Sequence, residues 1–230
     1  MSCESNAMSN LQPTFLIVAG PNGSGKTTFA SQLQQHSWAR DAVNINADTL
    51  AQKLGDWNDE RYTRQAQAMA VELLNSAMQK GENILYETVF SHYSKVELIK
   101  RALSLGYFIR LFFICTETPR INIDRVAERF ARGGHSVPGD KVTSRYNRSL
   151  VYGAEAMQLV QRGYLYDNST PANQQGDSFH LILRTINGDS FKLYKSRETL
   201  PLTYAYFLRD FLGNTDYPLL HAIPVTHRQG

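Results

Sequence analysis

A glycine-rich run near the start of the chain restricts the folds open to this sequence more than any other feature. Residues 14–19 before it are apolar, aromatic or β-branched, which is typical of a strand buried on both faces. Gly20-Pro-Asn-Gly-Ser-Gly-Lys26-Thr27 follows at once, and residues 26–35 are expected to form a helix. Glycines in such a turn let successive backbone N–H groups point at one anion. The run therefore predicts a phosphate-binding loop, or P-loop.

The chemistry of a triphosphate indicates what the residues of this loop would do. Glycines allow the backbone to approach the phosphates closely. Lys26 is expected to reach the β- and γ-phosphates, and the hydroxyl of Thr27 is expected to ligate Mg²⁺. The residues predicted to bind ATP here are Gly20, Pro21, Asn22, Gly23, Ser24, Gly25, Lys26, Thr27 and Thr28.

Apolar runs and helical stretches alternate through the first 169 residues. Further strands are expected at residues 42–46, 83–87, 107–115 and 163–167, and helices at 61–80, 93–105, 120–131 and 140–162. This alternation predicts an α/β fold of the P-loop kinase type, in which helices cover both faces of a mainly parallel sheet. The apolar strand at 107–115 is expected to be central in that sheet.

The pattern changes after residue 169. Asn187 and Gly188 lie between two strand-like runs at 179–184 and 190–194, which is a strong hairpin signal, and a helix is expected at 202–212. We therefore expect three regions. Residues 1–12 form a disordered tail with a remnant of tag removal, 13–169 a kinase-like core with a lid near 125–148, and 170–230 an appendage of hairpin and helix.

Composition narrows the classes of function. Hydrophobic residues make up 42% of the chain and charged residues 20%, as in soluble globular proteins. The net charge of +3 makes nucleic acid an improbable partner, since nucleic-acid binding usually needs basic residues gathered on one face. No apolar run approaches the roughly 18 residues that cross a bilayer. The two cysteines, Cys3 and Cys115, argue against a disulfide framework and fit a cytoplasmic location.

Two acidic residues follow or end predicted strands, where ligands collect in α/β sheets. Asp48 follows the strand at 42–46 and could accept a proton from an attacking hydroxyl group. The alternative is that Asp48 caps the helix beginning there. Glu87 ends the strand at 83–87, beside Thr88, and could hold a metal-bound water or a substrate hydroxyl. The alternative for Glu87 is an ordinary surface carboxylate.

Several arginines surround a glycine-rich break at residues 133–139. Arg125, Arg129 and Arg132 precede it, and Arg145 and Arg148 follow it. The planar guanidinium group matches phosphate oxygens, and a hinged segment that carries arginine can close over a nucleotide. The alternative for each arginine is a solvated position on a helix. Together they predict a lid that brings positive charge to the γ-phosphate.

The order of these motifs resembles the zeta-toxin-like P-loop kinases over about residues 13–169. The first set of motifs is Gly20-Pro-Asn-Gly-Ser-Gly-Lys-Thr-Thr28, Asn44-Ile-Asn-Ala-Asp48 and Glu87-Thr-Val-Phe-Ser91. A second set is similar to a bacterial branch of the group often labelled only as an ATPase: Arg125-Val-Ala-Glu-Arg129, Arg132-Gly-Gly-His-Ser-Val-Pro138, Arg145-Tyr-Asn-Arg-Ser149 and Tyr166-Asp-Asn-Ser169.

The resemblance implies an ATP- and Mg²⁺-dependent kinase that acts on a small molecule. In the better-understood toxin members the acceptor is a hydroxyl of a UDP-linked amino sugar, and an antitoxin protein can be a partner. The resemblance implies that Lys26 binds phosphate and that Asp48 is the general base. It implies that Glu87 and Thr88 contact the substrate. Arg132 and Arg145 would close over the phosphates, and Asn168 would lie near the adenine. Arg129 and Arg148 compete for the two closing roles. The lid motif and the tail differ from the UDP-sugar kinases, so the acceptor stays open.

Two other functions remain open from the sequence. A kinase acting on a nucleic-acid end would use the same loop with a different acceptor site, and steep salt dependence of oligonucleotide binding would indicate it. A nucleotide-dependent interaction module would bind ATP without transferring phosphate to a small molecule. Turnover of ATP with and without candidate acceptors distinguishes this module from a kinase.

Overall fold

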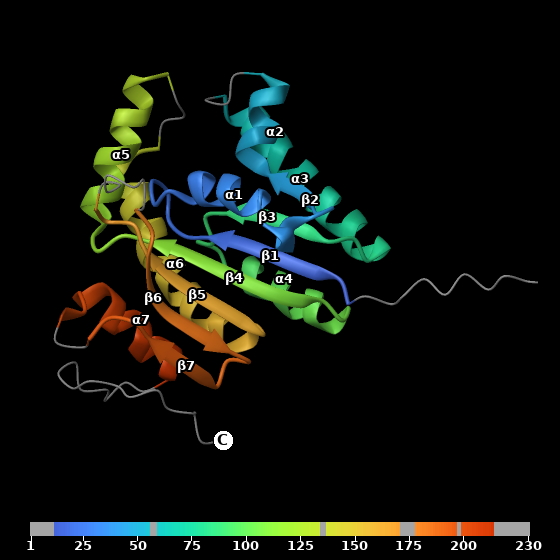
Figure 1. Cartoon of the computed structure of the whole chain (residues 1–230). Coiled ribbons are helices and arrows are strands. Elements are labelled where there is room, and N and C mark those ends of the chain that lie inside the picture. The colour runs from blue at the N-terminus through green and yellow to red at the C-terminus, as the bar shows by residue number, and fades with distance from the viewer. Residues whose placement is uncertain (1–11, 56–58, 134–136, 171–177, 197–198, 214–230) are drawn as a thin grey trace, which may run out of the picture.

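The computed structural model describes residues 12–55, 59–133, 137–170, 178–196 and 199–213 (Figure 1). Within these residues seven strands form one sheet in the order β2-β3-β1-β4-β5-β6-β7. The strands are β1 (Thr14–Ala19), β2 (Val43–Asn46), β3 (Ile84–Thr88), β4 (Phe108–Cys115), β5 (Arg162–Asp167), β6 (His180–Ile186) and β7 (Ser190–Leu193). The helices are α1 (Lys26–Gln34), α2 (Ala47–Leu54), α3 (Glu60–Lys80), α4 (Ser94–Ser104), α5 (Pro119–Ala131), α6 (Gly139–Leu159) and α7 (Leu202–Leu212), with a 3₁₀ turn, η1 (Ser37–Ala39).

The predicted α/β fold with a mainly parallel sheet is confirmed. The first five strands along the chain pair in parallel, and only β6 runs in the opposite direction, antiparallel to both β5 and β7. β4 is the middle strand, as its apolar sequence predicted, and β3 and β4 flank β1. The carboxyl ends of β1, β3 and β4 therefore meet where the glycine-rich loop leaves β1, which is the usual ligand edge of such sheets.

Helices cover both faces of the sheet, and each face has its own apolar cluster. Side chains of α3, α4, α6 and α7 pack against one face, around Phe15, Ile109 and Phe113. Helix α1 packs against the other face, over Leu16 and Val18. In Figure 1, α4, α6 and α7 lie together on one side of β4–β7, while α1 lies on the opposite side of β1. Successive strand residues alternate between the two clusters because side chains alternate across a strand.

The expected C-terminal hairpin continues the main sheet. Asn187 and Gly188 both have positive φ, 52° and 74°, which the tight turn between β6 and β7 requires. β6 pairs with β5, and α7 packs against α6. The buried hydroxyl of Tyr204 on α7 donates to Asp167 Oδ1 at 2.6 Å, which ties the helix to the end of β5.

Three of the expected segments lie partly outside the described residues. They are the tail (residues 1–11), the glycine-rich break (134–136) and the polar stretch after residue 170 (171–177). Within the residues that the structure does describe, no helix combines the length and the apolar character that crossing a membrane requires.

Candidate functional site

The glycine-rich loop has positive φ angles, which favour glycine, at three positions. Gly20, Gly23 and Gly25 have φ of 142°, 75° and 94°. A Cβ atom at Gly20 would lie 1.9 Å from the carbonyl oxygen of Ile114, and one at Gly23 would lie 2.7 Å from that of Asn122. Side chains at these positions are therefore excluded by the strand and helix behind the loop. The cradle that results suits close approach by phosphate groups.

Two buried asparagines hold this loop from behind. Asn122 on α5 donates from Nδ2 to the carbonyl oxygen of Asn22, and Asn168, after β5, donates to that of Ser24 at 2.8 Å. Arg125 in turn donates to the carbonyl oxygen of Asn168 at 2.7 Å. The side-chain amide of Asn168 is thus engaged with the loop, and Arg125 supports it instead of facing the cavity. Sequence reasoning missed Asn122, whose one signal is its place four residues before Val126 on the buried stripe of α5.

Lys26 is a buried cation at the start of α1. Its side chain is 8% exposed, and Nζ donates to the carbonyl oxygen of Pro21 at 2.8 Å. Burial lowers the pKa of Lys26, and the nearby charges of Glu87 and Asp48 oppose that shift. The ammonium group is therefore held beside the loop, with an unfavourable desolvation that an anion in the cradle would relieve.

Glu87 on β3 is buried, so its interpretation as an ordinary surface carboxylate is wrong. It is 9% exposed and accepts hydrogen bonds from Thr27 Oγ1 at 2.7 Å and from Asn46 Nδ2 at 2.6 Å. Burial raises the pKa of Glu87, while the charge of Lys26 and the hydrogen bond from Thr27 lower it. Three elements thus meet at this carboxylate: the loop with α1, the end of β2, and β3.

Asp48 lies in the first turn of α2, but it does not cap that helix. The N-cap is Asn46, whose Oδ1 accepts hydrogen bonds from the backbone nitrogens of Asp48 at 2.8 Å and Thr49 at 3.4 Å. The capping interpretation of Asp48 is therefore wrong. Its exposed carboxylate lines the cavity described next, and its charge acts on both Lys26 and Glu87.

A cavity of about 520 Å³ opens beside these residues. Lys26, Asp48 and Glu87 line it next to the loop. The remaining wall is formed by β3, the segment after it and the neighbouring helices: Thr63, Gln67, Val71, Tyr86, Thr88, Phe90, Ser91, His92, Ser94 and Lys95. Lys95 Nζ donates to the hydroxyl of Tyr86 at 2.8 Å. Phe90, a residue of the motif at 87–91 for which the sequence predicted no role, is buried in the cavity wall at a positive φ of 58°.

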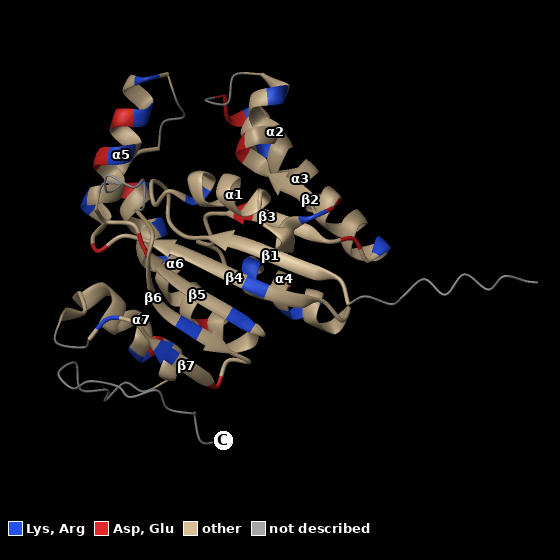
Figure 2. Ribbon diagram, in the orientation of Figure 1, with Lys and Arg blue, Asp and Glu red and all other residues tan. Residues whose placement is uncertain are grey.

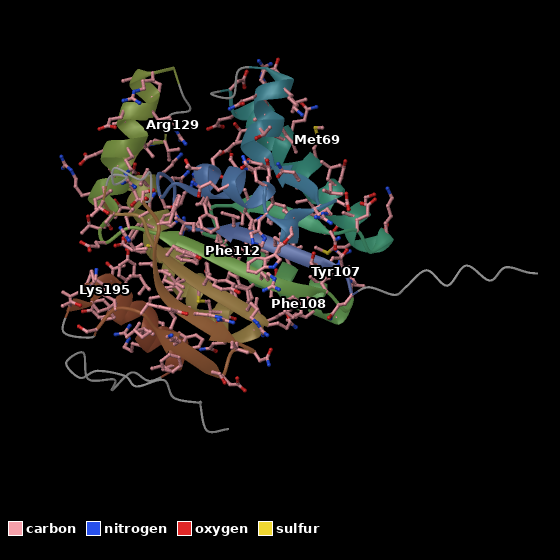
Figure 3. The ribbon with its side chains drawn as sticks, viewed as in Figure 1. Met69, Tyr107, Phe108, Phe112, Arg129 and Lys195 are labelled. Atoms are coloured by element: carbon pink, nitrogen blue, oxygen red, sulfur yellow. The ribbon has the colours of Figure 1, made fainter. Side chains whose placement is uncertain are left out.

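The arginines of the expected lid lie at different distances from this cavity. Arg145 and Arg148 of α6 line it, and Arg145 Nη1 is 3.5 Å from Asn22 Oδ1. Arg129 on α5, labelled in Figure 3, is close enough for its charge to lower the pKa of Lys26. Arg132 is exposed at the end of α5 and does not line the cavity. Of the two arginines that the resemblance favoured, the structure therefore places only Arg145 at the site.

The oxygen atoms gathered here fit the preferences of Mg²⁺. The hydroxyl of Thr27 and the carboxylates of Glu87 and Asp48 are hard ligands of the kind that Mg²⁺ takes in phosphate sites. The glycine-rich loop, in which a Cβ at Gly20, Gly23 or Gly25 would collide with surrounding atoms, equally fits a chain of phosphates. The donor set and the cradle are adjacent, as an ATP–Mg²⁺ complex requires.

Comparison with protein families finds one match over most of the chain. The model of the Zeta toxin family matches residues 2–167. A protein of Haemophilus influenzae, described as uncharacterized, is 28% identical over 138 residues, which cover 59% of this chain and 94% of that protein.

Solved structures with related folds include proteins found with partner chains or nucleotide. The PezAT toxin–antitoxin system of Streptococcus pneumoniae matches with a TM-score of 0.53 and 19% identity, over 74% of this chain and 72% of that one. The AvrRxo1-ORF1:-ORF2 crystal structure with ATP matches with a TM-score of 0.60 and 15% identity, over 80% of this chain and 61% of that one. At these identities the likeness concerns the fold, which is that of P-loop kinases.

Proposed function

This chain belongs to the Zeta toxin family, and from that membership we propose that it transfers the γ-phosphoryl group of ATP to a hydroxyl group of a small molecule. The observation that carries the proposal is the cavity in which a P-loop lysine, an exposed carboxylate and two arginines converge. Lys26, Asp48, Arg145 and Arg148 supply the charges that phosphoryl transfer requires around one reacting phosphate.

In this proposal the loop and its lysine bind the nucleotide. The backbone N–H groups of residues 20–27 and the Lys26 ammonium hold the β- and γ-phosphates, and Arg145 and Arg148 offset the negative charge of the transferred group. Mg²⁺, when held by Thr27 and Glu87, would add further positive charge against the phosphate oxygens. The raised pKa of Glu87 and the lowered pKa of Lys26 both reflect burial that bound phosphates and metal would offset.

Asp48 is the proposed general base. The acceptor oxygen forms a bond to the γ-phosphorus, the bond from that phosphorus to the bridging oxygen of ADP breaks, and the acceptor proton passes to the Asp48 carboxylate. Because Asn46 already caps α2, the Asp48 carboxylate is free of that structural task. Its charge is felt at Lys26, which supports its position near the γ-phosphate.

The remaining wall of the cavity supports a small-molecule acceptor. Its volume of about 520 Å³ lies within the range of small-molecule sites. Thr88, Ser91 and the Lys95–Tyr86 pair offer hydrogen-bonding groups alongside the apolar Val71. A nucleotide sugar, the acceptor that the family resemblance implies, is the first candidate. A restraining antitoxin protein is a second part of the proposal, because related folds include a toxin–antitoxin system.

The decisive experiment follows labelled γ-phosphate from ATP into a bacterial metabolite extract. Wild-type protein should produce a new phosphorylated species, and Asp48→Asn should lower that rate by about 10²–10⁴-fold while the ATP affinity changes by less than about threefold. Asp41→Asn removes an exposed carboxylate elsewhere and should leave the rate unchanged. Transfer by Asp48→Asn at the wild-type rate contradicts the role of the base.

A different outcome would favour the interaction module over the kinase. ATP hydrolysis that no metabolite alters, together with nucleotide-dependent capture of a protein partner, would replace the proposed transfer. Binding of oligonucleotides that falls steeply with salt and competes with the acceptor would favour a nucleic-acid end instead.

A further inference from the structure

Four cations lie on one face of the sheet, away from the cavity. Arg110, Arg162, Arg184 and Lys192 come from β4, β5, β6 and β7 respectively. Arg110 pairs with Arg162, and Arg184 pairs with both Tyr164 and Lys192. Cross-strand partners and residues two apart on a strand share a face, so all four side chains belong to the same face. Figure 2 shows Lys or Arg on each of these neighbouring strands.

This face is the one that α1 only partly covers. Phe112 and Tyr164, which lie on the same face as the four cations, belong to the apolar cluster under α1. Helices α4, α6 and α7, which Figure 1 shows along β4–β7, pack on the opposite face. The four cations also lie toward the starts of β4 and β5, whereas the P-loop lies at the carboxyl end of the sheet. The surface is therefore distinct from the nucleotide site.

Aromatic rings hold the arginines of this surface in place. The guanidinium carbon of Arg110 lies 4.1 Å from the ring centroid of Trp38 and 4.9 Å from that of Phe108. Arg162 lies 5.7 Å from the same Phe108 ring, which Figure 3 labels. Positive charges over ring faces are ordered at little further entropic cost on binding. The surface is thus a prearranged array of cations.

The array has no negative counterpart within the described residues. None of its four members forms an ion pair with a carboxylate there. Arg184 Nε is buried and has no hydrogen-bond partner in that part of the chain. Solvated sheet faces ordinarily interleave both signs of charge, because charges of one sign repel across neighbouring strands. An array of cations without a negative counterpart therefore indicates an anionic ligand.

We propose that this cationic sheet face, defined by Arg110, Arg162, Arg184 and Lys192, binds an acidic polypeptide segment of a partner protein. Guanidinium groups accept carboxylates in a bidentate arrangement, and complementary charge would steer and orient the partner. The terminal segments of this chain do not supply the charge, since residues 1–11 and 214–230 contain one acidic residue each, Glu4 and Asp216.

The aromatic rings favour a polypeptide over single-stranded nucleic acid. Nucleic acid on such a face would stack its bases on free rings. Phe112 and Tyr164 stack on each other at 5.0 Å and are only 2% and 8% exposed. The rings of Trp38 and Tyr194 are exposed, but each is already in contact with a cation of the surface, Arg110 at 4.1 Å and Lys192 at 4.8 Å from the ring centroid. These contacts compete with the stacking of bases and leave the charges available to carboxylates.

The test compares two variants with the same change in net charge. Arg162→Glu with Lys192→Glu reverses two charges of the surface, and Arg64→Glu with Lys80→Glu reverses two exposed charges on α3. Fluorescence anisotropy of a labelled oligoglutamate peptide is measured with the full chain, beside an oligothymidylate of equal length. The surface variant should bind the peptide roughly tenfold more weakly than wild type, and the α3 variant within about twofold. Phosphoryl transfer by the surface variant should stay unchanged, so the test of this surface and the test of the proposed function can fail separately.

Three results would overturn the proposal: equal losses in both variants, no binding of the peptide by wild type, or tighter binding of the oligothymidylate. Because Arg162 also donates to the carbonyl oxygen of Gln161, unfolding of the double variant is checked by its Tm. Lys192→Glu alone changes an exposed side chain and provides the second measurement. We expect Lys192→Glu to bind the peptide roughly threefold more weakly than wild type, and an unchanged peptide affinity would contradict the proposal.

Discussion

Asn168 and Ser24, 144 residues apart, are joined by a hydrogen bond from the side-chain amide of Asn168 to the carbonyl oxygen of Ser24, at 2.8 Å. The bond links the end of β5 to the middle of the P-loop. Asn168 is 7% exposed, so its donor has little access to water, and loss of the bond leaves the carbonyl group of Ser24 without this partner. The shape of the phosphate cradle therefore depends on a strand that lies two places from β1 in the sheet.

Asn168→Ala should weaken binding of ATP by about tenfold, because losing a buried hydrogen bond costs about 1–3 kcal/mol and loosens the loop. Calorimetric titration with a non-hydrolysable ATP analogue measures this, and Asn44→Ala, an exposed asparagine on β2, is the control. The affinity of Asn168→Ala for tripolyphosphate should fall by the same factor as its affinity for the ATP analogue. Loss confined to the adenine nucleotide would show that Asn168 acts on the base and not on the loop.

Gly25→Ala should abolish measurable nucleotide binding and lower the free energy of unfolding by about 1–3 kcal/mol. A Cβ at Gly25 would lie 2.3 Å from Asn168 Nδ2, at a φ of 94° that disfavours any side chain. Gly81→Ala is the matched control, since its φ is 67° but no atom lies within 4 Å of the added Cβ. Denaturant unfolding compares the two variants, and equal effects on stability would contradict the steric explanation.

Arg145→Ala should lower kcat/KM for phosphoryl transfer by about 10²–10³-fold, because Arg145 lines the cavity beside the loop. Arg132→Ala should change it by less than about threefold, since Arg132 is exposed at the end of α5. Steady-state kinetics of the two variants measure both changes in kcat/KM. A larger loss in Arg132→Ala would mean that α5 moves toward the phosphates when the enzyme closes.

The pH dependence of stability should report the buried carboxyl group of Glu87. Burial raises its folded-state pKa above the ordinary 4.5, so the wild type loses unfolding free energy as the pH rises from 4.5 through that higher value. Glu87→Gln does not titrate, so the Tm of this variant minus that of wild type should rise over this range, by about 3 °C.

The nucleotide-free protein is used for this comparison, because ATP and Mg²⁺ would change the charge around Glu87. Glu97→Gln, which replaces an exposed glutamate on α4, should give a Tm curve parallel to that of wild type. Parallel curves for Glu87→Gln and wild type would show that the carboxyl group of Glu87 is not appreciably destabilised by burial.

The elements of the fold could be predicted because each depends on signals close together in the chain. The helix predicted at 202–212 is α7 (Leu202–Leu212), and the hairpin at Asn187 and Gly188 has the positive φ angles that such turns require. The central place of β4 followed from its nearly unbroken apolar sequence. Boundaries elsewhere coincided or differed by up to three residues, since the ends of helices depend on capping contacts that a periodic pattern does not contain.

The site was only partly accessible to the same reasoning. Glu87 was singled out as a strand end, but its hydrogen bonds to Thr27 and Asn46 arise because β2, β3 and β1 are neighbours in the sheet. Asn122 gave no local signal beyond its helical spacing. Arg145 and Arg132 looked equivalent in sequence, but in the structure Arg145 on α6 lines the cavity, whereas Arg132 is exposed at the end of α5.

By itself, the sequence determined the strand, the glycine-rich loop and the helix at residues 14–35, because their signals are contiguous in the chain and because glycine permits the positive φ found at Gly20, Gly23 and Gly25. Tertiary structure alone decided which distant groups surround that loop, and it gathered Arg110, Arg162, Arg184 and Lys192 on one face of a chain with a net charge of only +3. A net charge counts ionised groups without placing them, whereas strand pairing brings residues far apart in sequence to neighbouring positions about 5 Å apart.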